Sequence, residues 1–345
     1  MSHPLASFYR GKRVLITGHT GFPGGWATAW LKLLGAQVYG YGLPPATRPN
    51  FFDASMLDRG MTSVFADLRD RNSLTTAFTE FQPEVVLHCA SRSNPHLAYR
   101  EPVETFSSNV MGTVLLLEEA RLTNSVRAIV NASSDMPDAD IPSSVEPSHI
   151  HNSSMACIEL VGTAFANSFL VPRGCAVATA CFADSIGGGD WREGRIAPNL
   201  VRSLMYGEPV EVTGAGKIRL WHVLNAIYGL LLLAQKLFEH GHQYCRRWDF
   251  KCTNGEPISA AEFSKEFVKI WDAIEPGASP ANAGGQSSKT NPGNAEPQLG
   301  WSNFLDPEQA IVWTVEWYRA FYANSSTAWR ATDEQIERYM QLTMG

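Results

Sequence analysis

The glycines of the stretch TGHTGFPGGW are spaced so that the backbone can approach a phosphate group closely. Gly18, Gly21 and Gly24 form a Gly-x-x-Gly-x-x-Gly pattern between an expected strand and an expected helix. Glycines permit a tight turn, and the helix N-terminus beyond them offers unpaired N–H groups and the positive end of its dipole to an anion. The pattern predicts a dinucleotide-binding loop, and a glycine turn kept only for packing is the alternative.

The second expected strand ends without the acidic residue that usually holds an adenosine ribose. It runs into GLPPATR, which has no carboxylate and brings Arg48 nearby, so NAD and NADP both stay open. Asp67 is a candidate adenine-side contact, with a helix or turn cap as the alternative. The candidate cofactor-binding residues are Gly18, Thr20, Gly21, Phe22, Gly24, Asp67, Leu68 and Ala90.

Strands alternate with helices in the first 180 residues. Strands are expected at 13–18, 36–43, 63–70 (ending at Asp67), 84–90 and 127–134, and helices at 25–35, 73–81, 102–122 and 152–170. This alternation implies a parallel sheet with helices on both faces. Gly35 is expected to end the first helix, and Ser73 is expected to cap the second.

The alternation of strands and helices becomes less regular after about residue 180. A short strand is expected at 207–212, a helix at 260–271, and two amphipathic helices close the chain. Residues 275–297 are rich in Gly, Pro, Ser and Asn and are expected to form a mobile loop. We therefore expect an α/β fold: a Rossmann-like, doubly wound parallel sheet over residues 1–180 and a smaller substrate-binding lobe over 181–345, with some segments returning to the core.

Composition argues against several classes of protein. The formal charge of -6, with basic and acidic residues mixed, does not resemble a nucleic-acid binder. The longest apolar run, 227–238, is too short to span a membrane and indicates a buried helix. The N-terminus has no signal-peptide pattern and the six cysteines form no CxxC pair, which favours reduced thiols in the cytoplasm. The close histidine pairs lack further ligands, so no metal site is expected.

The chain resembles the extended short-chain dehydrogenase/reductases, the NAD-dependent epimerase/dehydratase family, and specifically the CDP-glucose 4,6-dehydratases. The matching stretches are GKRVLITGHTGFPGGW (11–26), PNFF (49–52), ADLRD (66–70), YREPVETFSSNVMGT (99–113), IGGGDW (186–191), GEPV (207–210), LLLAQKL (231–237), LGW (299–301) and TVEWYRAF (314–321). The resemblance implies bound NAD, a nucleotide-sugar substrate, and a homodimer built from helices 102–122 and 152–170. It also implies internal redox, in which the sugar is oxidised at C4, water is lost across C5 and C6, and the hydride returns to C6.

The sequence departs from this family at the positions of the family's catalytic residues. The family's Tyr-x-x-x-Lys reads His151-Asn-Ser-Ser-Met155, and Met136 stands where a second Lys is expected. Cys181 replaces an Arg, Asp184 replaces an Asn, and LHCASRSN departs from Leu-Ala-Ala-Gln. The resemblance leaves Ser133, Asp135 and His151 as candidate catalytic residues. It also implies the substrate-binding candidates Asp184, Arg195, Arg219, Trp221 and His222.

These replacements change what the site can do. A methionine cannot replace an ammonium group that fixes a ribose and stabilises a phenolate, and its alternative role is packing. His151 titrates near neutrality and could act as a base, while Asp135 could exchange a proton if its surroundings raise its pKa. The alternatives are an exposed helix-start residue for His151, a turn carboxylate for Asp135, and a surface salt bridge for Arg219, which otherwise matches a diphosphate-binding arginine.

Three hypotheses follow. The first is a nucleotide-sugar enzyme, on a CDP-hexose by resemblance, with rewired acid–base residues that perform a lyase or epimerase-type reaction. The second is a catalytically dead pseudoenzyme that serves as a binding or regulatory partner. The third is a conventional CDP-glucose 4,6-dehydratase with unusual residues. Replacing His151 or Asp135 separates the first from the second, because only an enzyme needs them.

Overall fold

The computed structural model describes residues 3–134, 150–183, 185–207, 217–218, 221–250, 257–275 and 298–344. These residues fall into two compact units. Unit 1 comprises residues 1–44, 60–182 and 229–250, and unit 2 comprises residues 45–59, 183–228 and 251–345. Helix α10 (Val223–His240) contributes residues to both units.

Unit 1 is built on a parallel sheet of seven described strands in the order β3-β2-β1-β4-β5-β6-β8. The strands are β1 Arg13–Thr17, β2 Gln37–Gly42, β3 Thr62–Phe65, β4 Val85–His88, β5 Ala128–Ser134, β6 Ala176–Phe182 and β8 Arg247–Phe250. Each neighbouring pair is parallel, which confirms the doubly wound α/β fold. The strand order reverses between β1 and β4, the place where such sheets bind ligands at their carboxyl ends.

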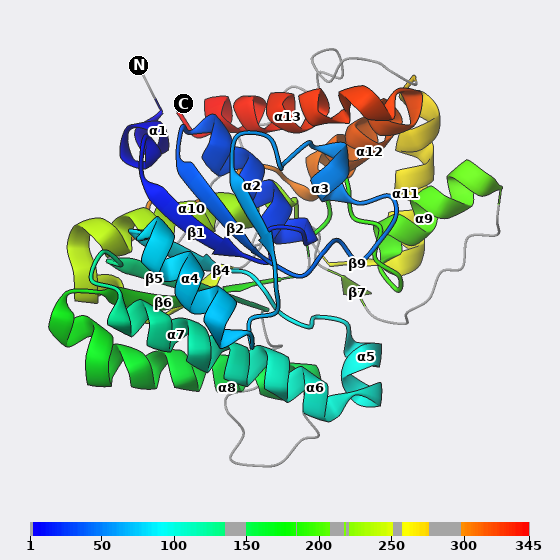
Figure 1. The fold of residues 1–345 in the computed structure, drawn as a ribbon. Coiled ribbons are helices and arrows are strands. Elements are labelled where there is room, and N and C mark those ends of the chain that lie inside the picture. Colours follow the sequence, from blue (N-terminus) through cyan, green and yellow to red (C-terminus); the bar gives the residue numbers. More distant parts are fainter. Residues whose placement is uncertain are drawn as a thin grey trace. The chain divides into compact units, whose positions relative to one another are not determined.

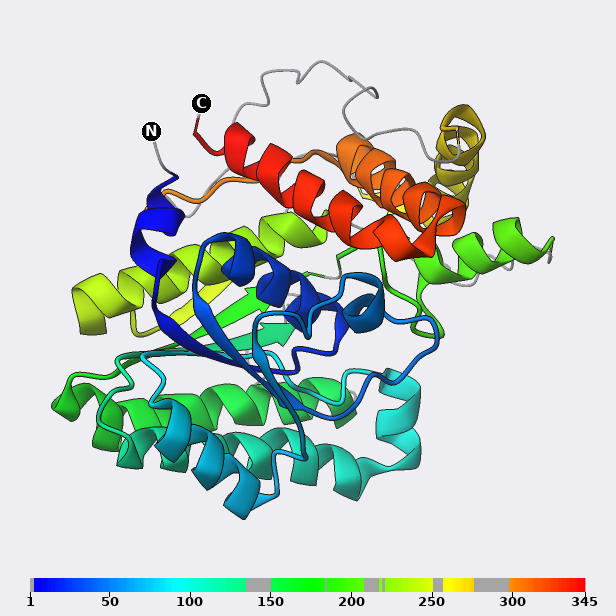
Figure 2. The same ribbon diagram turned by 45° about the horizontal axis from the view of Figure 1, so that its top comes forward.

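Helices cover both faces of this sheet. Figures 1 and 2 show α4, α7 and α8 along one face, and α2 with α10 along the other. The helices of unit 1 are α1 Pro4–Tyr9, α2 Phe22–Leu33, α4 Arg71–Phe81, α5 Pro95–Arg100, α6 Pro102–Phe106, α7 Gly112–Leu122 and α8 Ile150–Phe165. Two π-helical turns, Ser107–Met111 and Ala166–Leu170, join α6 to α7 and extend α8, and 3-10 turns follow at Val171–Arg173 and Gly241–Tyr244.

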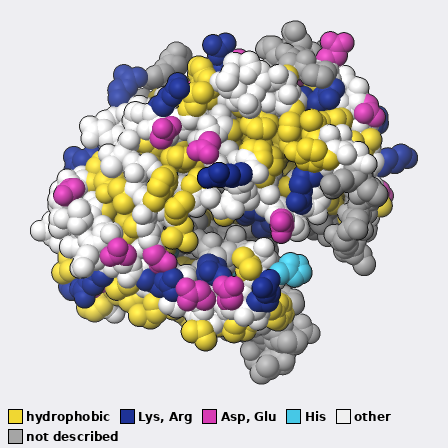
Figure 3. All heavy atoms as spheres, turned by 45° about the vertical axis from the view of Figure 1, so that its right-hand side comes forward, with side chains coloured by type: hydrophobic (Ala, Val, Ile, Leu, Met, Phe, Trp, Pro, Cys, Tyr) yellow, Lys and Arg dark blue, Asp and Glu magenta, His cyan; other side chains and the backbone are white. Residues whose placement is uncertain are grey.

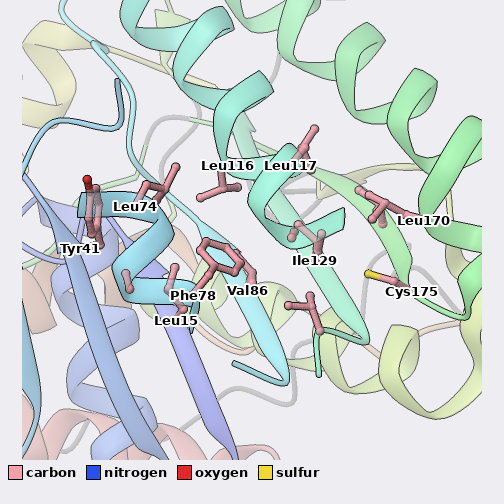
Figure 4. Close-up of a cluster of buried hydrophobic side chains, with 14 of the residues drawn as sticks. Leu15, Tyr41, Leu74, Phe78, Val86, Leu116, Leu117, Ile129, Leu170 and Cys175 are labelled. Carbon is pink, nitrogen blue, oxygen red and sulfur yellow. The ribbon is translucent and has the colours of Figure 1, made fainter. Parts of the chain in front are cut away.

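The face under α4, α7 and α8 carries a hydrophobic core. Leu15, Val86 and Ile129 project from three adjacent strands and meet Phe78 of α4 and Leu116 of α7 (Figure 4). Each of these side chains is fully buried. Burying such a side chain contributes roughly 1.5–3 kcal/mol, so this cluster fixes the helices on the sheet.

Several element boundaries differ from the sequence expectation. Helix α4 begins at Arg71 rather than Ser73, because Asp70 caps it and accepts hydrogen bonds from the Ser73 N–H and O–H. The expected cap at Ser73 is therefore wrong. Helix α2 begins at Phe22, three residues early, and β3 ends at Phe65 before Asp67. The helix expected over 102–122 is interrupted by the π-helical turn.

One described helical stretch, Ile150–Arg173, is long and apolar enough to cross a membrane by length and composition alone. Its mean hydropathy reaches 1.5 over an 18-residue window, of which 33% is buried. This corrects the expectation that no apolar run reaches spanning length. Core helices of soluble proteins have the same length and composition. The run 227–238 lies within α10 and is largely buried, as expected.

Unit 2 is mainly helical. Its elements are α3 Phe51–Ala54, α9 Ile196–Tyr206, an antiparallel pair of β7 Lys217–Ile218 and β9 Ile258–Ser259, α11 Ala260–Ala273, α12 Pro307–Ala323, a 3-10 turn Ser325–Thr327, and α13 Ala328–Leu342. Capping boxes start α11 at Ser259 and α12 at Asp306. The expected helix at 260–271 and both closing helices are confirmed. Most of the expected strand at 207–212 and of the expected loop at 275–297 lies outside the described residues.

The face drawn in Figure 3 carries mixed charge. Lys and Arg side chains are interspersed there with Asp and Glu side chains. The described residues of that face therefore form no continuous basic surface.

Candidate functional site

The glycine-rich loop follows β1 directly and has a geometry that only glycine suits. Gly18 adopts φ +72°, and a Cβ placed on it would lie 2.8 Å from both the nitrogen and the Cα of Ala90. Ala90 follows β4, so the loop after β1 and the segment after β4 touch at the strand-order reversal. The Ala90 N–H donates to Thr17 Oγ1 at 3.2 Å, which fixes this contact.

Helix α2 lies unusually close to the loop. Gly21 is its N-cap residue, and its N–H donates to Gly18 O at 2.9 Å. A Cβ on Gly24 would lie 2.2 Å from the same oxygen. The 12-residue helix thus aims its N-terminal turn at the carboxyl end of β1, an arrangement suited to a pyrophosphate.

The loop is also tied to the strands beside it. Thr20 donates its hydroxyl to Leu43 O at 2.8 Å, just beyond β2, and Phe22 is buried at the start of α2. The sequence interpretation missed His19, whose Nε2 lies 2.7 Å from Ser63 Oγ and whose ring stacks on Phe65. Burial lowers the pKa of His19 to about 4, so this ring is neutral at pH 7.

Asp67 is held by its neighbour Arg69. Its Oδ1 accepts the Arg69 N–H at 2.8 Å, and its Oδ2 lies 2.7 Å from Arg69 Nη2. The hydrogen bonds from Arg69 lower the pKa of this carboxyl. Arg69 also pairs with Glu104 at 2.7 Å, while Leu68 packs against Gly112 of α7. Asp67 therefore has the turn-capping role foreseen as its alternative, and its adenine contact stays a prediction.

Ser133 lies on β5 beside Cys181 of β6, in register with it. Burial raises the pKa of the Cys181 thiol to about 12. The arginine expected by resemblance at this position is thus replaced by a neutral thiol. Asp135 and Met136 lie outside the described residues.

His151 lies in the first turn of α8 and is buried, so the alternative of an exposed helix-start residue is wrong. Met155 is one turn further along the same buried face, with only 3% of its surface exposed. It packs in the interior as foreseen and brings no charge. The described part of α8 therefore keeps a titratable ring and lacks a cation at the two motif positions.

Two further residues of this region were missed in the sequence. His88 ends β4 and is buried, and Asn109 lies in the π-helical turn between α6 and α7. A histidine at the end of the apolar run VVLH was a usable signal, because buried polar groups need partners. Asn109 gave no comparable signal, since its role depends on contacts with residues distant in the sequence.

The substrate candidates that the structure describes lie in unit 2. Arg195 is the N-cap residue of α9. Trp221 and His222 are fully buried, and Trp221 Nε1 donates to Ala183 O at 3.1 Å. His222 Nδ1 accepts the Leu224 N–H at 3.3 Å, and burial lowers the pKa of this histidine to about 3. Their contact with a ligand stays a prediction. Asp184 and Arg219 lie outside the described residues.

Comparisons with known proteins agree with this geometry. The model of the NAD dependent epimerase/dehydratase family matches residues 14–244. The chain is 32% identical over 359 residues to the CDP-glucose 4,6-dehydratase of Salmonella typhimurium (strain LT2), covering 98% of each protein.

Two solved structures are similar at lower identity. One is a UDP-glucose 4-epimerase with UDP-glucose from Thermotoga maritima, with a TM-score of 0.71 and 20% identity over 90% of this chain and 99% of that one. The other is the Bordetella bronchiseptica enzyme WbmF in complex with NAD+, with a TM-score of 0.69 and 17% identity over 96% of this chain and 100% of that one. At these identities the likeness concerns the fold alone.

Proposed function

This chain belongs to the NAD dependent epimerase/dehydratase family, and on that premise we propose that it binds a nicotinamide dinucleotide and modifies a nucleotide sugar. The sugar is proposed to be a CDP-hexose, because the full-length relative from Salmonella typhimurium is a CDP-glucose 4,6-dehydratase. The observation that carries the proposal is the loop from Gly18 to Gly24, whose glycines bring the N-terminus of α2 against the carboxyl end of β1.

NAD is the proposed cofactor. We assign its pyrophosphate to the loop between Gly18 and Phe22 at the N-terminus of α2, and its adenine to the neighbourhood of Asp67 and Leu68. The WbmF structure contains NAD+, which supports the choice. NADP stays the alternative, because β2 ends at Gly42 without a carboxylate to select a free ribose hydroxyl. When bound, the nicotinamide supplies a hydride acceptor.

Proton transfer is assigned to Ser133, Asp135 and His151. The His151 ring takes the place of a tyrosine, and a neutral imidazole can accept a hydroxyl proton at pH 7 without help from a nearby cation. Ser133 offers a hydroxyl beside an uncharged thiol. The proposed reaction is a dehydration, or an epimerisation or elimination on a substrate that already carries a ketone.

A homodimer is part of the proposal. Helices α6, α7 and α8 pack together, and they and the π-helical turns next to them leave large apolar side chains exposed to solvent. These side chains are Val103, Met111, Leu122, Leu160 and Phe169. Exposed apolar side chains on adjoining helices are suited to be buried against a second copy.

The second candidate function is a pseudoenzyme that binds ligands or a partner without turnover. The observation that favours it is the burial of Met155, which leaves no cation at that motif position to hold a ribose. Both candidates bind ligands, so turnover distinguishes them.

Ligand binding is the first test of the proposal. We expect calorimetric titration to show NAD binding, and line broadening in proton spectra to show that CDP-glucose binds more tightly than UDP-glucose. NADP and UDP-glucose serve as the matched comparisons. A protein that is folded by circular dichroism and binds neither NAD nor NADP would overturn the proposal.

A further inference from the structure

A row of polar side chains crosses the sheet of unit 1 directly above its hydrophobic core. Thr17, His88 and Asn131 are in register on β1, β4 and β5, each two residues after Leu15, Val86 and Ile129, respectively. Side chains alternate along strands, so the row shares the face that α4, α7 and α8 cover. All three polar residues are buried. Buried polar groups cost free energy unless they are hydrogen-bonded, which raises the question of what this row does.

His88 is bonded at both ring nitrogens. Thr17 Oγ1 lies 2.7 Å from Nδ1, and Thr113 Oγ1 of α7 lies 2.9 Å from Nε2. Thr113 donates its own proton to Asn109 O at 2.6 Å, so it must accept from Nε2–H. With the proton on Nε2, Nδ1 is an acceptor, so Thr17 Oγ1, which also accepts the Ala90 N–H, donates its own proton to Nδ1. The partners thus select one neutral tautomer, with the proton on Nε2.

Asn109 continues the chain of bonds into α8. Its Oδ1 accepts the Arg92 N–H at 2.7 Å, and its Nδ2 donates to Ser154 Oγ at 2.9 Å. Ser154 in turn donates to His151 O at 2.7 Å. One amide thus binds both the loop after β4 and the first turn of α8. The π-helical turn is what places it there, and such turns are frequent at functional sites.

We propose that His88 is a positioning residue that couples the cofactor loop to the first turn of α8. The bonded path begins at Thr17, which immediately precedes Gly18, and ends at the backbone of His151. The inference rests on the proposed function in one respect, since it takes the loop to bind the dinucleotide. Met155 cannot bond to a ribose, so the path offers a link between loop and helix that does not pass through the cofactor.

The burial of the ring suits this role. Burial lowers the pKa of His88 to about 4, so the ring stays neutral at pH 7 and keeps its Nε2–H donor. A charged ring would turn Nδ1 into a donor that faces the Thr17 hydroxyl. The bond to Thr17 would then have to reverse, and the Thr17 proton would have no acceptor in this chain of bonds.

Three substitutions of His88 remove different hydrogen bonds from this path. His88→Asn keeps an acceptor for Thr17 and loses the donor to Thr113, His88→Gln does the reverse, and His88→Phe removes both. Asn131→Leu is the matched control: it removes a buried polar group from the same row, and Asn131 has no side-chain hydrogen bond among the described residues. Hydrogen exchange over residues 150–158, with and without NAD, and NAD affinity are the readouts.

In the wild type, NAD is expected to slow exchange in residues 150–158 as well as in the loop. In His88→Phe, loop protection should persist, protection of residues 150–158 should be lost, and NAD should bind roughly tenfold more weakly. His88→Asn and His88→Gln should fall between these limits, and Asn131→Leu should behave as wild type. Folded His88 variants with wild-type affinity and protection, or the same losses in Asn131→Leu, would overturn the inference.

Failure of the proposed function would look different. If the wild type binds no dinucleotide, two measurements without ligand still test the positioning role of His88. Nitrogen-15 spectra of the imidazoles should show His88 as the Nε2–H tautomer, and residues 150–158 should exchange faster in His88→Phe than in Asn131→Leu. The Nδ1–H tautomer, or equal exchange in both variants, would contradict the positioning role.

Discussion

A Cβ placed on Gly24 would lie 2.2 Å from the carbonyl oxygen of Gly18. No real side chain tolerates such a contact with backbone. The first turn of α2 and the end of β1 can therefore approach each other only because residue 24 is glycine. This approach brings the helix N-terminus to the position at which we propose that a pyrophosphate binds.

Gly24→Ala should weaken cofactor binding. The added methyl group forces α2 away from the loop, so we expect at least roughly a tenfold loss of NAD affinity by calorimetry, together with about 1–3 kcal/mol of lost stability. Gly174→Ala is the control, because an added Cβ on Gly174 would have no atom within 4 Å, while its positive φ, which Gly24 lacks, makes the added methyl group costly in stability alone. It should cost about 1 kcal/mol of stability and leave NAD affinity unchanged. Equal affinities of the two variants would contradict this account of the loop.

The loop could be predicted because its constraints are local. Gly18 and Gly24 are the ends of a seven-residue stretch and lie in contact, so the spacing of the glycines in the sequence is enough to predict the contact. The cap of α4 is also local, yet it was assigned to Ser73, because Asp70 and Ser73 are both good capping residues and periodicity does not place the first turn. Stretches governed by neighbours in sequence were thus predicted to within a few residues.

Stability should fall in mild acid because several histidines are buried. Burial lowers the pKa of His19 and His88 to about 4 and of His222 to about 3, whereas an unfolded histidine titrates near 6.5. Below pH 6.5 the unfolded chain binds protons that the folded chain does not. Each histidine should therefore cost about 1.4 kcal/mol of unfolding free energy per pH unit as the pH falls towards these values.

Urea unfolding of His222→Phe checks this. The variant should lose stability at pH 7, because the bond from the Leu224 N–H is lost, while an aromatic ring remains to pack on Trp313. Between pH 6.5 and 5 its stability should fall less steeply than that of the wild type, because unfolding of the variant takes up about one proton fewer. Parallel pH profiles of the two proteins would contradict the burial of a neutral His222.

The ion pair of Glu316 and Arg338 should matter more at high pH. Arg338 Nη1 lies 2.9 Å from Glu316 Oε2, and burial raises the pKa of Glu316 to about 7. At pH 8 Arg338→Met forces Glu316 either to stay buried as an unpaired carboxylate or to take up a proton, which should cost about 3–5 kcal/mol of unfolding free energy. At pH 5 the carboxyl is protonated in the fold, so the cost should be clearly smaller.

A matched background tests the cause. In Glu316→Gln the added Arg338→Met change should have a cost that does not depend on pH. A cost of Arg338→Met that is equal at pH 5 and pH 8 in the wild-type background would show that the pair does not act through the charge of Glu316.

The less predictable part of the site depends on contacts between distant residues. Asn109 binds the backbone of Arg92 and the hydroxyl of Ser154, and nothing in NVMGT indicates these partners. Trp221 and His222 were expected to bind substrate, and the structure buries both within unit 2. Sequence motifs specify residue types, whereas the direction of a side chain is decided by packing against residues far along the chain.

The exposed apolar face of α8 should carry the dimer contact. Leu160 is 64% exposed on this helix, and a charge there would have to be buried in the dimer. We expect light scattering to give twice the 38.0 kDa chain mass for the wild type and a single chain mass for Leu160→Glu. Met344→Glu, at an exposed methionine of the C-terminal tail, is the control and should remain dimeric. A monomeric wild type at assay concentration would contradict the proposed dimer.

The central claim is that the site still turns over a nucleotide sugar without the Tyr and Lys of its family. The most direct test is a proton NMR time course with CDP-glucose and NAD in deuterated water, for the wild type and for His151→Ala. We predict a 4-keto-6-deoxy product that carries deuterium at C5, formed by the wild type and lost in His151→Ala. An unchanged spectrum with the wild type for both CDP-glucose and its 4-keto-6-deoxy derivative, while line broadening shows that each is bound, would contradict the claim and favour a binding protein.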